Sequence, residues 1–227
     1  MEQMKKTKFF LDTASLDEIL YWKKFDLVDG VTTNPKLLSD QNCEPLKRVK
    51  EICKNVTGPV SAQITETDEK NMIEQGIMLS KISKNIVVKI PLIENGVSVA
   101  KTLAKKKIRL NITLGFDPSQ VLFFRNIDIS YFSFIVGRVE DFGVSNRENI
   151  SKLKQIININ KMKCELLCAS IRNTEQLIVS IISGSEIITV PPKTWKSILN
   201  NKFSLDGQKD FLNSWIDLKK NKKGYTL

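Results

Sequence analysis

Eight short runs rich in β-branched and aromatic residues recur along the sequence, and the stretches between most of them are long enough to form a helix. The runs are Lys8–Asp12, Asp29–Thr33, Pro59–Ile64, Ile86–Pro91, Ile108–Thr113, Tyr131–Val136, Glu165–Ser170 and Glu186–Val190. Helices are expected over Thr67–Lys81, Asn95–Lys105, Pro118–Arg125, Asn146–Asn158 and Thr174–Ser183. This alternation predicts an α/β fold built on a parallel sheet.

The number of runs and the character of two of them favour a closed (β/α)8 barrel over an open sheet. Ile86–Pro91 and Glu165–Ser170 are apolar on both alternating faces, as expected of parallel strands that helices cover on one side and a barrel interior on the other. An open, doubly wound sheet would normally carry a glycine-rich phosphate loop after its first strand, and residues 10–15 contain no glycine. We therefore predict one TIM-barrel domain over residues 1–227, with an additional C-terminal helix over Asp206–Leu218.

The sequence carries no predicted export signal or membrane span. Met1–Lys6 is polar and charged, so it lacks the apolar middle region of a signal peptide. Lys or Arg interrupts every hydrophobic segment before it reaches the roughly 18 apolar residues that cross a bilayer. We expect a cytoplasmic protein with no membrane partner.

The absence of histidine narrows the chemistry open to this chain. Without imidazole, proton transfer must use Lys, Asp, Glu, Tyr, Cys or water. The cysteines, which are expected to stay reduced, are Cys43, Cys53, Cys164 and Cys168. Because they include no C-x-x-C pair and no histidine can complete a mixed zinc site, we expect neither a metal site nor a cofactor.

The formal charge of +10 suits either a nucleic-acid-binding protein or an enzyme for anionic substrates. Many lysines lie in polar stretches such as Lys101–Lys107 and Lys219–Lys223, where a solvated helix face is the usual explanation. The chain lacks aromatic stacking clusters and any nucleic-acid recognition motif, so no nucleic-acid partner is expected.

Lys89 is the residue that most suggests catalysis. It lies in the middle of the hydrophobic run Ile86–Pro91. Burial disfavours the ammonium form and lowers the pKa of a lysine, which yields a neutral amine that can attack a ketone and form an iminium. The alternative is an edge-strand lysine whose amine reaches solvent. Polar residues also gather at the ends of the other predicted strands, and in (β/α)8 enzymes those ends carry the active site.

Several short motifs occur in a fixed order along nearly the whole chain. They are FLDTAS, DGVTTNP, GPVSAQI, NIVVKIP, LNITL, FIVGR, CASIR and the C-terminal DGQKDFLNSWIDL. In this order and spacing the chain resembles the small transaldolases and their relatives, the fructose-6-phosphate aldolases. The resemblance implies a transferase of carbohydrate metabolism and the pentose phosphate pathway that acts on sugar phosphates and forms a homo-oligomer, a pentamer or decamer.

The resemblance also implies roles for individual residues. Lys89 would form the Schiff base and Asp12 would act as acid and base, although Asp12 could instead cap a helix over Ser15–Trp22. Gln63 and Thr113 would hold a water that relays protons. The implied substrate-binding residues are Thr33, Asn34, Asn111, Ser133, Arg138, Ser170 and Arg172. Among these, Arg138, Ser170 and Arg172 would hold the phosphate.

Two positions depart from the family pattern. Gln63 stands where small transaldolases generally place glutamate and the aldolases place glutamine. Ile135 stands where transaldolases have phenylalanine and the aldolases have tyrosine. Because Ile135 has no hydroxyl, we expect transfer of a dihydroxyacetone unit between sugar phosphates. The alternatives are cleavage and synthesis of the fructose-6-phosphate aldolase type and action on a specialised sugar.

Overall fold

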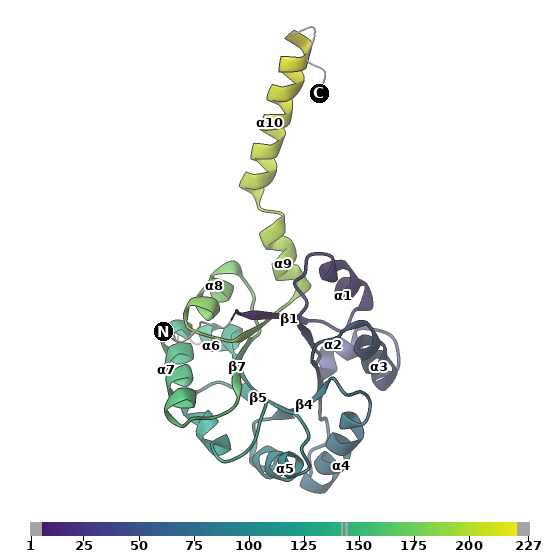
Figure 1. Cartoon of the computed structure of the whole chain (residues 1–227), viewed down its shortest axis with the longest axis vertical. Helices are drawn as coiled ribbons and strands as arrows, with labels where there is room; N and C mark the ends of the chain where they lie inside the picture. Colours follow the sequence, from purple (N-terminus) through teal and green to yellow (C-terminus); the bar gives the residue numbers. More distant parts are fainter. Residues whose placement is uncertain (1–5, 142, 144, 222–227) are drawn as a thin grey trace. The chain divides into compact units, whose positions relative to one another are not determined.

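The computed structural model describes residues 6–141, 143 and 145–221. Eight parallel strands close into a barrel in the order β1 to β8 (Figure 1). The strands are β1 (Lys8–Asp12), β2 (Gly30–Thr32), β3 (Val60–Gln63), β4 (Ile86–Pro91), β5 (Leu110–Gly115), β6 (Tyr131–Ile135), β7 (Glu165–Ala169) and β8 (Ile187–Val190). Each predicted run contains or overlaps one of these strands, and the predicted (β/α)8 barrel is confirmed.

Helices surround the barrel (Figure 1). They are α1 (Leu16–Lys23), α2 (Pro35–Ser39), α3 (Pro45–Asn55), α4 (Glu69–Ser80), α5 (Glu94–Lys105), the 3-10 helix η1 (Pro118–Phe124), α6 (Val136–Asp141), α7 (Asn146–Ile159) and α8 (Thr174–Ile182). The predicted helix over Pro118–Arg125 is thus a 3-10 helix, which Asp117 and Gln120 hold in a capping box.

The barrel interior is filled by a cluster of large apolar side chains. Phe10, Val87, Tyr131, Leu167 and Ile187 form this cluster, and each is at most 4% exposed. They come from five different strands, so their packing ties the barrel together across its axis. Fully burying side chains of this size stabilises the fold by about 1.5–3 kcal/mol each.

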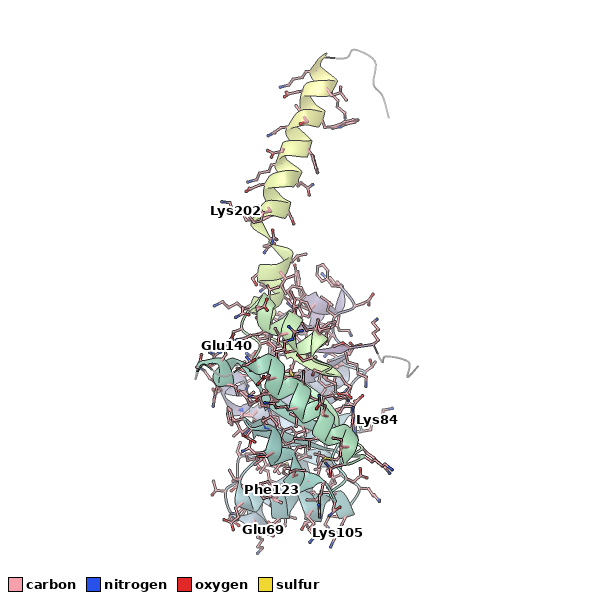
Figure 2. All side chains as sticks on the ribbon, turned by 90° about the vertical axis from the view of Figure 1, so that its left-hand side faces the viewer. Glu69, Lys84, Lys105, Phe123, Glu140 and Lys202 are labelled. Carbon is pink, nitrogen blue, oxygen red and sulfur yellow. The ribbon has the colours of Figure 1, made fainter. Side chains whose placement is uncertain are left out.

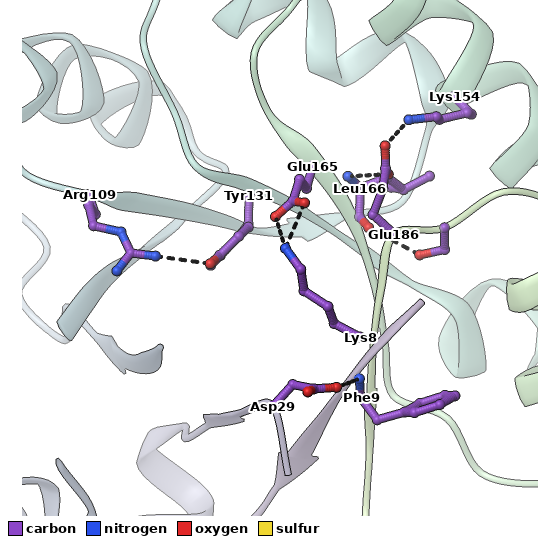
Figure 3. Close-up of polar contacts among 10 residues, drawn as sticks. Lys8, Phe9, Asp29, Arg109, Tyr131, Lys154, Glu165, Leu166 and Glu186 are labelled. Carbon is purple, nitrogen blue, oxygen red and sulfur yellow. Dashed lines mark hydrogen bonds and ion pairs between the residues drawn. The ribbon is translucent and has the colours of Figure 1, made fainter. Parts of the chain in front are cut away.

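Polar contacts join the strands at their N-terminal ends (Figure 3). Lys8 Nζ donates to the Glu165 carboxylate at 2.9 and 3.1 Å, and Arg109 Nη2 donates to Tyr131 Oη at 3.0 Å. Burial raises the pKa of the Tyr131 hydroxyl, while the positive charge of Arg109 opposes this shift. Ion pairs of this partly exposed kind contribute about 0.2–1 kcal/mol each, so this end of the barrel is interpreted as structural.

Charged side chains on the outer helices and loops, including Lys84 and Lys105, point away from the strands (Figure 2). Within the described residues, no helix combines the length and apolarity that a membrane span requires.

The chain divides into two compact units, Met1–Pro192 and Lys193–Leu227. The barrel lies in the first unit, and the second consists mostly of α9 (Pro192–Leu199) and α10 (Lys202–Asn221). The predicted C-terminal helix over Asp206–Leu218 is confirmed, although α10 begins four residues earlier and ends three residues later. The single domain expected over residues 1–227 stays a prediction.

Candidate active site

The C-terminal ends of the strands surround a cavity of about 420 Å³, which is large enough for a small phosphorylated sugar. Its lining residues are Asp12, Thr32, Asn34, Pro35, Lys36, Gln63, Lys89, Asn111, Thr113, Leu114, Ser133, Ile135, Arg138, Leu167, Ala169, Ser170 and Thr189. Leu167 also belongs to the core cluster, so the cavity rests directly on the packed interior.

Lys89 projects into the barrel interior from β4. Val87 belongs to the core cluster, and side chains two residues apart on a strand point to the same face. The Lys89 side chain is 7% exposed, and its Nζ donates to Thr33 O. The alternative of an edge-strand lysine is wrong, because a closed barrel has no edge strand.

The environment of Lys89 increases the fraction of its amine that is neutral. Burial lowers the pKa of Lys89 to about 8, although the negative charge of Asp12 raises it. One pH unit below that pKa, about a tenth of the molecules carry a neutral, nucleophilic amine. An amine of this kind can attack a ketone at neutral pH.

Asp12 is the last residue of β1 and lines the same cavity. Its Oδ1 accepts a hydrogen bond of 2.8 Å from Thr32 Oγ1. Burial raises the pKa of Asp12, while the charge of Lys89 and the Thr32 hydrogen bond oppose this shift. A carboxyl group with a raised pKa beside an amine with a lowered one suits proton transfer near neutral pH. The helix-cap alternative for Asp12 is wrong, because Ser15 caps α1 by accepting from Glu18 N.

Asn111 is held beside Lys89, its partner in the β4–β5 register, by hydrogen bonds on both sides of its amide. Ser133 Oγ donates to Asn111 Oδ1 at 2.6 Å, and Asn111 Nδ2 donates to Ser61 Oγ at 3.1 Å. The orientation of the amide is therefore specified, and its second N–H can bind a substrate hydroxyl.

The remaining polar residues predicted near the reacting carbons also lie at the cavity. Gln63 is the register partner of Lys89 on β3, and Thr113 lies on β5. Asn34 caps α2, and its Oδ1 accepts from Leu37 N at 2.9 Å. This bond leaves the N–H groups of the Asn34 amide as donors for a substrate.

The cationic residues predicted to bind phosphate differ in their surroundings. Arg138 lines the cavity and is exposed, and within the described residues no carboxylate pairs with it. Arg172, in contrast, does not line the cavity, and its Nη1 donates to both Asp141 oxygens at 2.7 and 2.9 Å. Gly137 allows Ser170 and Arg172 to approach the backbone closely, because a Cβ at this position would lie 2.4 Å from Ser170 O and 2.7 Å from Arg172 Nε.

Two lining residues adopt a left-handed backbone conformation that non-glycine residues rarely adopt. Leu114 has φ 67° and Ser170 has φ 62°. Leu114 lies where the register between β5 and β6 shifts, just before Gly115. Such conformations cost roughly 1–3 kcal/mol and are common at functional sites.

All the predicted site residues line the cavity except Thr33 and Arg172. Thr33 Oγ1 instead donates to Ser61 O at 2.8 Å, and its backbone oxygen accepts from Lys89. Lys36 and Thr189 line the cavity without having been predicted. The sequence signal for Lys36 was its position two residues after Asn34, which was itself predicted to bind the substrate. Across the described part of the chain, no cluster of three His, Cys, Asp or Glu side chains could hold a metal.

Residues 9–223 match the family model described as Transaldolase/Fructose-6-phosphate aldolase. A protein from Thermodesulfovibrio yellowstonii named probable transaldolase is 37% identical over 213 residues, which cover 94% of this chain and 100% of that protein. Proteins of the same name from Geobacillus thermodenitrificans and Bartonella tribocorum are 36% and 34% identical, each over 92% of this chain and over 98% and 96% of their own lengths.

A solved structure supports the fold alone. It is a protein of the dihydrodipicolinate synthase family from Coccidioides immitis, with a TM-score of 0.58 at 10% sequence identity, and the match covers 90% of this chain and 76% of that chain. The family match spans nearly the whole chain, and the relatives share more than a third of their residues with it. The chain therefore belongs to the transaldolase/fructose-6-phosphate aldolase family.

Proposed function

We propose that this protein is a transaldolase that transfers a dihydroxyacetone unit between sugar phosphates through a Schiff base on Lys89. The observation that carries this proposal is the buried Lys89 amine, with its pKa lowered to about 8, in the same cavity as the Asp12 carboxyl group. Family membership supports the same conclusion.

In this reaction Lys89 Nζ attacks the C2 ketone of a ketose phosphate, and loss of water gives an iminium ion. Asp12 then removes the proton of the C4 hydroxyl. The C3–C4 bond breaks, its electron pair moves into the iminium, and an aldose phosphate leaves. The enamine that remains on Lys89 attacks a second aldose phosphate, Asp12 returns the proton, and water releases the new ketose phosphate.

The other lining residues are proposed to bind the substrate. Asn111 and Ser133 lie beside Lys89 and would bind hydroxyls of the dihydroxyacetone unit, and Asn34 would bind a hydroxyl farther along the sugar. Gln63 and Thr113 would hold a water near the imine. Arg138 and Ser170 would bind the phosphate, with Arg172 supporting them from outside the cavity.

Replacement of Arg138 with alanine is expected to weaken binding of phosphorylated substrates by about 1.5–3 kcal/mol, which is roughly a ten- to hundred-fold loss in kcat/KM. Arg172→Ala should have a smaller effect, because the Arg172 guanidinium already pairs with Asp141. Steady-state kinetics with phosphorylated donors and with dihydroxyacetone would measure both effects. Arg147→Ala, which removes an exposed arginine of α7, is the matched control. An equal loss on dihydroxyacetone would contradict a phosphate-binding role.

The aldolase alternative is favoured by Gln63 and opposed by Ile135, which lines the cavity and is 7% exposed. Because no side-chain hydroxyl is present at position 135, the enamine would lack a proton donor there and would wait for an aldehyde acceptor. We expect transfer to be faster than release of dihydroxyacetone.

Ile135→Tyr is expected to shift the ratio of release to transfer upwards by about tenfold, since a positioned acid accelerates protonation of the enamine. Ile135→Phe supplies the ring without the hydroxyl and should not cause this shift. Both rates can be measured by coupled assays for free dihydroxyacetone and for the product ketose phosphate. If the unmodified protein releases dihydroxyacetone faster than it transfers it, the aldolase alternative is correct.

We further propose that the protein acts in the cytoplasm as a homo-oligomer, either a pentamer or a decamer. Support for an oligomer comes from the exposed large apolar side chains of α10, which a second copy of the chain could cover. They are Phe203, Leu205, Phe211, Leu212, Trp215 and Ile216.

A further inference from the structure

Two buried threonine hydroxyls, one from each strand that pairs with β1, form a chain of hydrogen bonds that ends at Asp12. Thr32 is 3% exposed and Thr189, on β8, is 1% exposed. Thr32 Oγ1 lies 2.8 Å from Asp12 Oδ1 and 2.7 Å from Thr189 Oγ1. The strand order explains the arrangement, because β1 pairs with β2 on one side and with β8 on the other.

The chemistry of the three groups determines the direction of both hydrogen bonds. An ionised carboxylate can only accept, so Thr32 must donate its single hydroxyl proton to Asp12 Oδ1. Thr32 then has no proton left for Thr189. The hydrogen in the 2.7 Å contact must therefore come from Thr189, which gives the order Thr189 to Thr32 to Asp12.

We propose that Thr189 is a positioning residue for the reaction, which directs the Thr32 hydroxyl onto Asp12 Oδ1 and so holds the carboxylate in its ionised, proton-accepting state. This inference rests on the proposed role of Asp12 as acid and base. A hydroxyl that accepts a hydrogen bond becomes a better donor, so Thr189 strengthens the bond that Thr32 makes to the carboxylate.

The same arrangement distinguishes the two oxygens of Asp12. Oδ1 accepts from Thr32, whereas within the described residues no group donates a hydrogen bond to Oδ2. Oδ2 is therefore the oxygen that exchanges the proton with the substrate, and the hydroxyl chain keeps the carboxylate from rotating.

Three substitutions at position 189 separate the hydroxyl from the shape of the side chain. Thr189→Val keeps the shape and removes the hydroxyl, Thr189→Ala removes both the hydroxyl and a methyl group, and Thr189→Ser keeps the hydroxyl. Loss of a bond that favours the ionised carboxylate raises its pKa. The acidic limb of the kcat/KM profile should therefore move to higher pH by roughly half a unit in the valine and alanine variants. This shift is a roughly threefold loss of activity on the acidic side.

The other charges around Asp12 are the same in every variant. Lys89 is the titratable group whose charge acts on Asp12, and Lys36 and Arg138 are the other cationic side chains that line the cavity. The strands that supply Thr32 and Thr189 add no charged side chain, since β2 is Gly-Val-Thr and β8 is Ile-Ile-Thr-Val.

A second readout does not depend on activity. In full-length protein labelled with 13C at aspartate carboxyl groups, the Asp12 signal can be assigned with Asp12→Asn and titrated by NMR. We expect its midpoint to rise in Thr189→Val and Thr189→Ala and to stay at the unmodified value in Thr189→Ser. Thermal unfolding of each variant shows that the fold is retained.

The NMR titrations test the role of Thr189 separately from the proposed transaldolase activity. An unchanged Asp12 midpoint in Thr189→Val and Thr189→Ala, or an equal shift in Thr189→Ser, would overturn it. If the unmodified protein performs no transfer, the proposed function fails, and the NMR titrations still decide whether Thr189 directs the Thr32 hydroxyl onto Asp12.

Discussion

Replacement of Lys89 with methionine is expected to abolish transfer, with a loss on the order of 10⁴-fold or more, since no amine remains to form the iminium. Reduction by borohydride with fructose 6-phosphate should attach a dihydroxyacetone unit to Lys89 of the unmodified protein and none to the variant. Intact-protein mass spectrometry followed by peptide mapping measures both the adduct and its position. Methionine has a similar length and fills the buried site without a charge, so we expect the variant to fold.

Lys36 provides the matched control, because it is the second lysine that lines the cavity and its side chain is exposed. Lys36→Met should keep the adduct on Lys89. If the adduct persists in Lys89→Met, or if it maps to Lys36, the proposed Schiff base is wrong. Because burial is what lowers the pKa of Lys89, reactivity is expected at this lysine and not at the many exposed ones.

The strands could be predicted from the sequence because their hydrophobic pattern is strong and local. The β4 run IVVKIP is buried at five successive positions, and such a run differs sharply from the polar stretches around it. Helices α2, α3, α6 and α9 were not predicted from the sequence. Residues 35–39 and 136–141 are too short to show a helical period, so α2 and α6 depend on their surroundings in the folded barrel.

The candidate site was predictable to the extent that strand ends converge in a barrel. This rule brings Asp12, Gln63, Lys89 and Asn111 together although they are far apart in the sequence. The rule predicts at which end of the barrel a residue lies, but it does not predict where the side chain points or which group it contacts.

Arg172 shows what the strand-end rule leaves out. Whether its guanidinium faces the cavity or pairs with Asp141 depends on α6, on the space left by Gly137 and on the left-handed backbone at Ser170. These features arise from packing between segments that are distant in the sequence. Thr189 was overlooked for a related reason, because the contact of its hydroxyl with Thr32 joins residues that are far apart in the sequence.

Asp12→Asn is expected to lower transfer by about 10²–10⁴-fold while leaving formation of the imine intact. Asparagine keeps the shape of the side chain and can still accept from Thr32, but it cannot take the proton of the C4 hydroxyl. Without that step the C3–C4 bond stays whole. Borohydride should therefore trap the complete ketose phosphate on Lys89 of the variant, where it traps a dihydroxyacetone unit on the unmodified protein.

The pH dependence of trapping gives an independent test of the same pair. Asp12 raises the pKa of Lys89, so its replacement should lower that pKa further below about 8. Half-maximal trapping is expected near pH 8 for the unmodified protein and at a lower pH for Asp12→Asn. In mild acid the variant should therefore form its imine more readily than the unmodified protein, although it cleaves the C3–C4 bond more slowly. Asp17→Asn, which neutralises an exposed aspartate of α1, should change neither property. A dihydroxyacetone adduct that forms at the unmodified rate in Asp12→Asn would mean that another group removes the proton, and only Lys89 would then remain assigned to the chemistry.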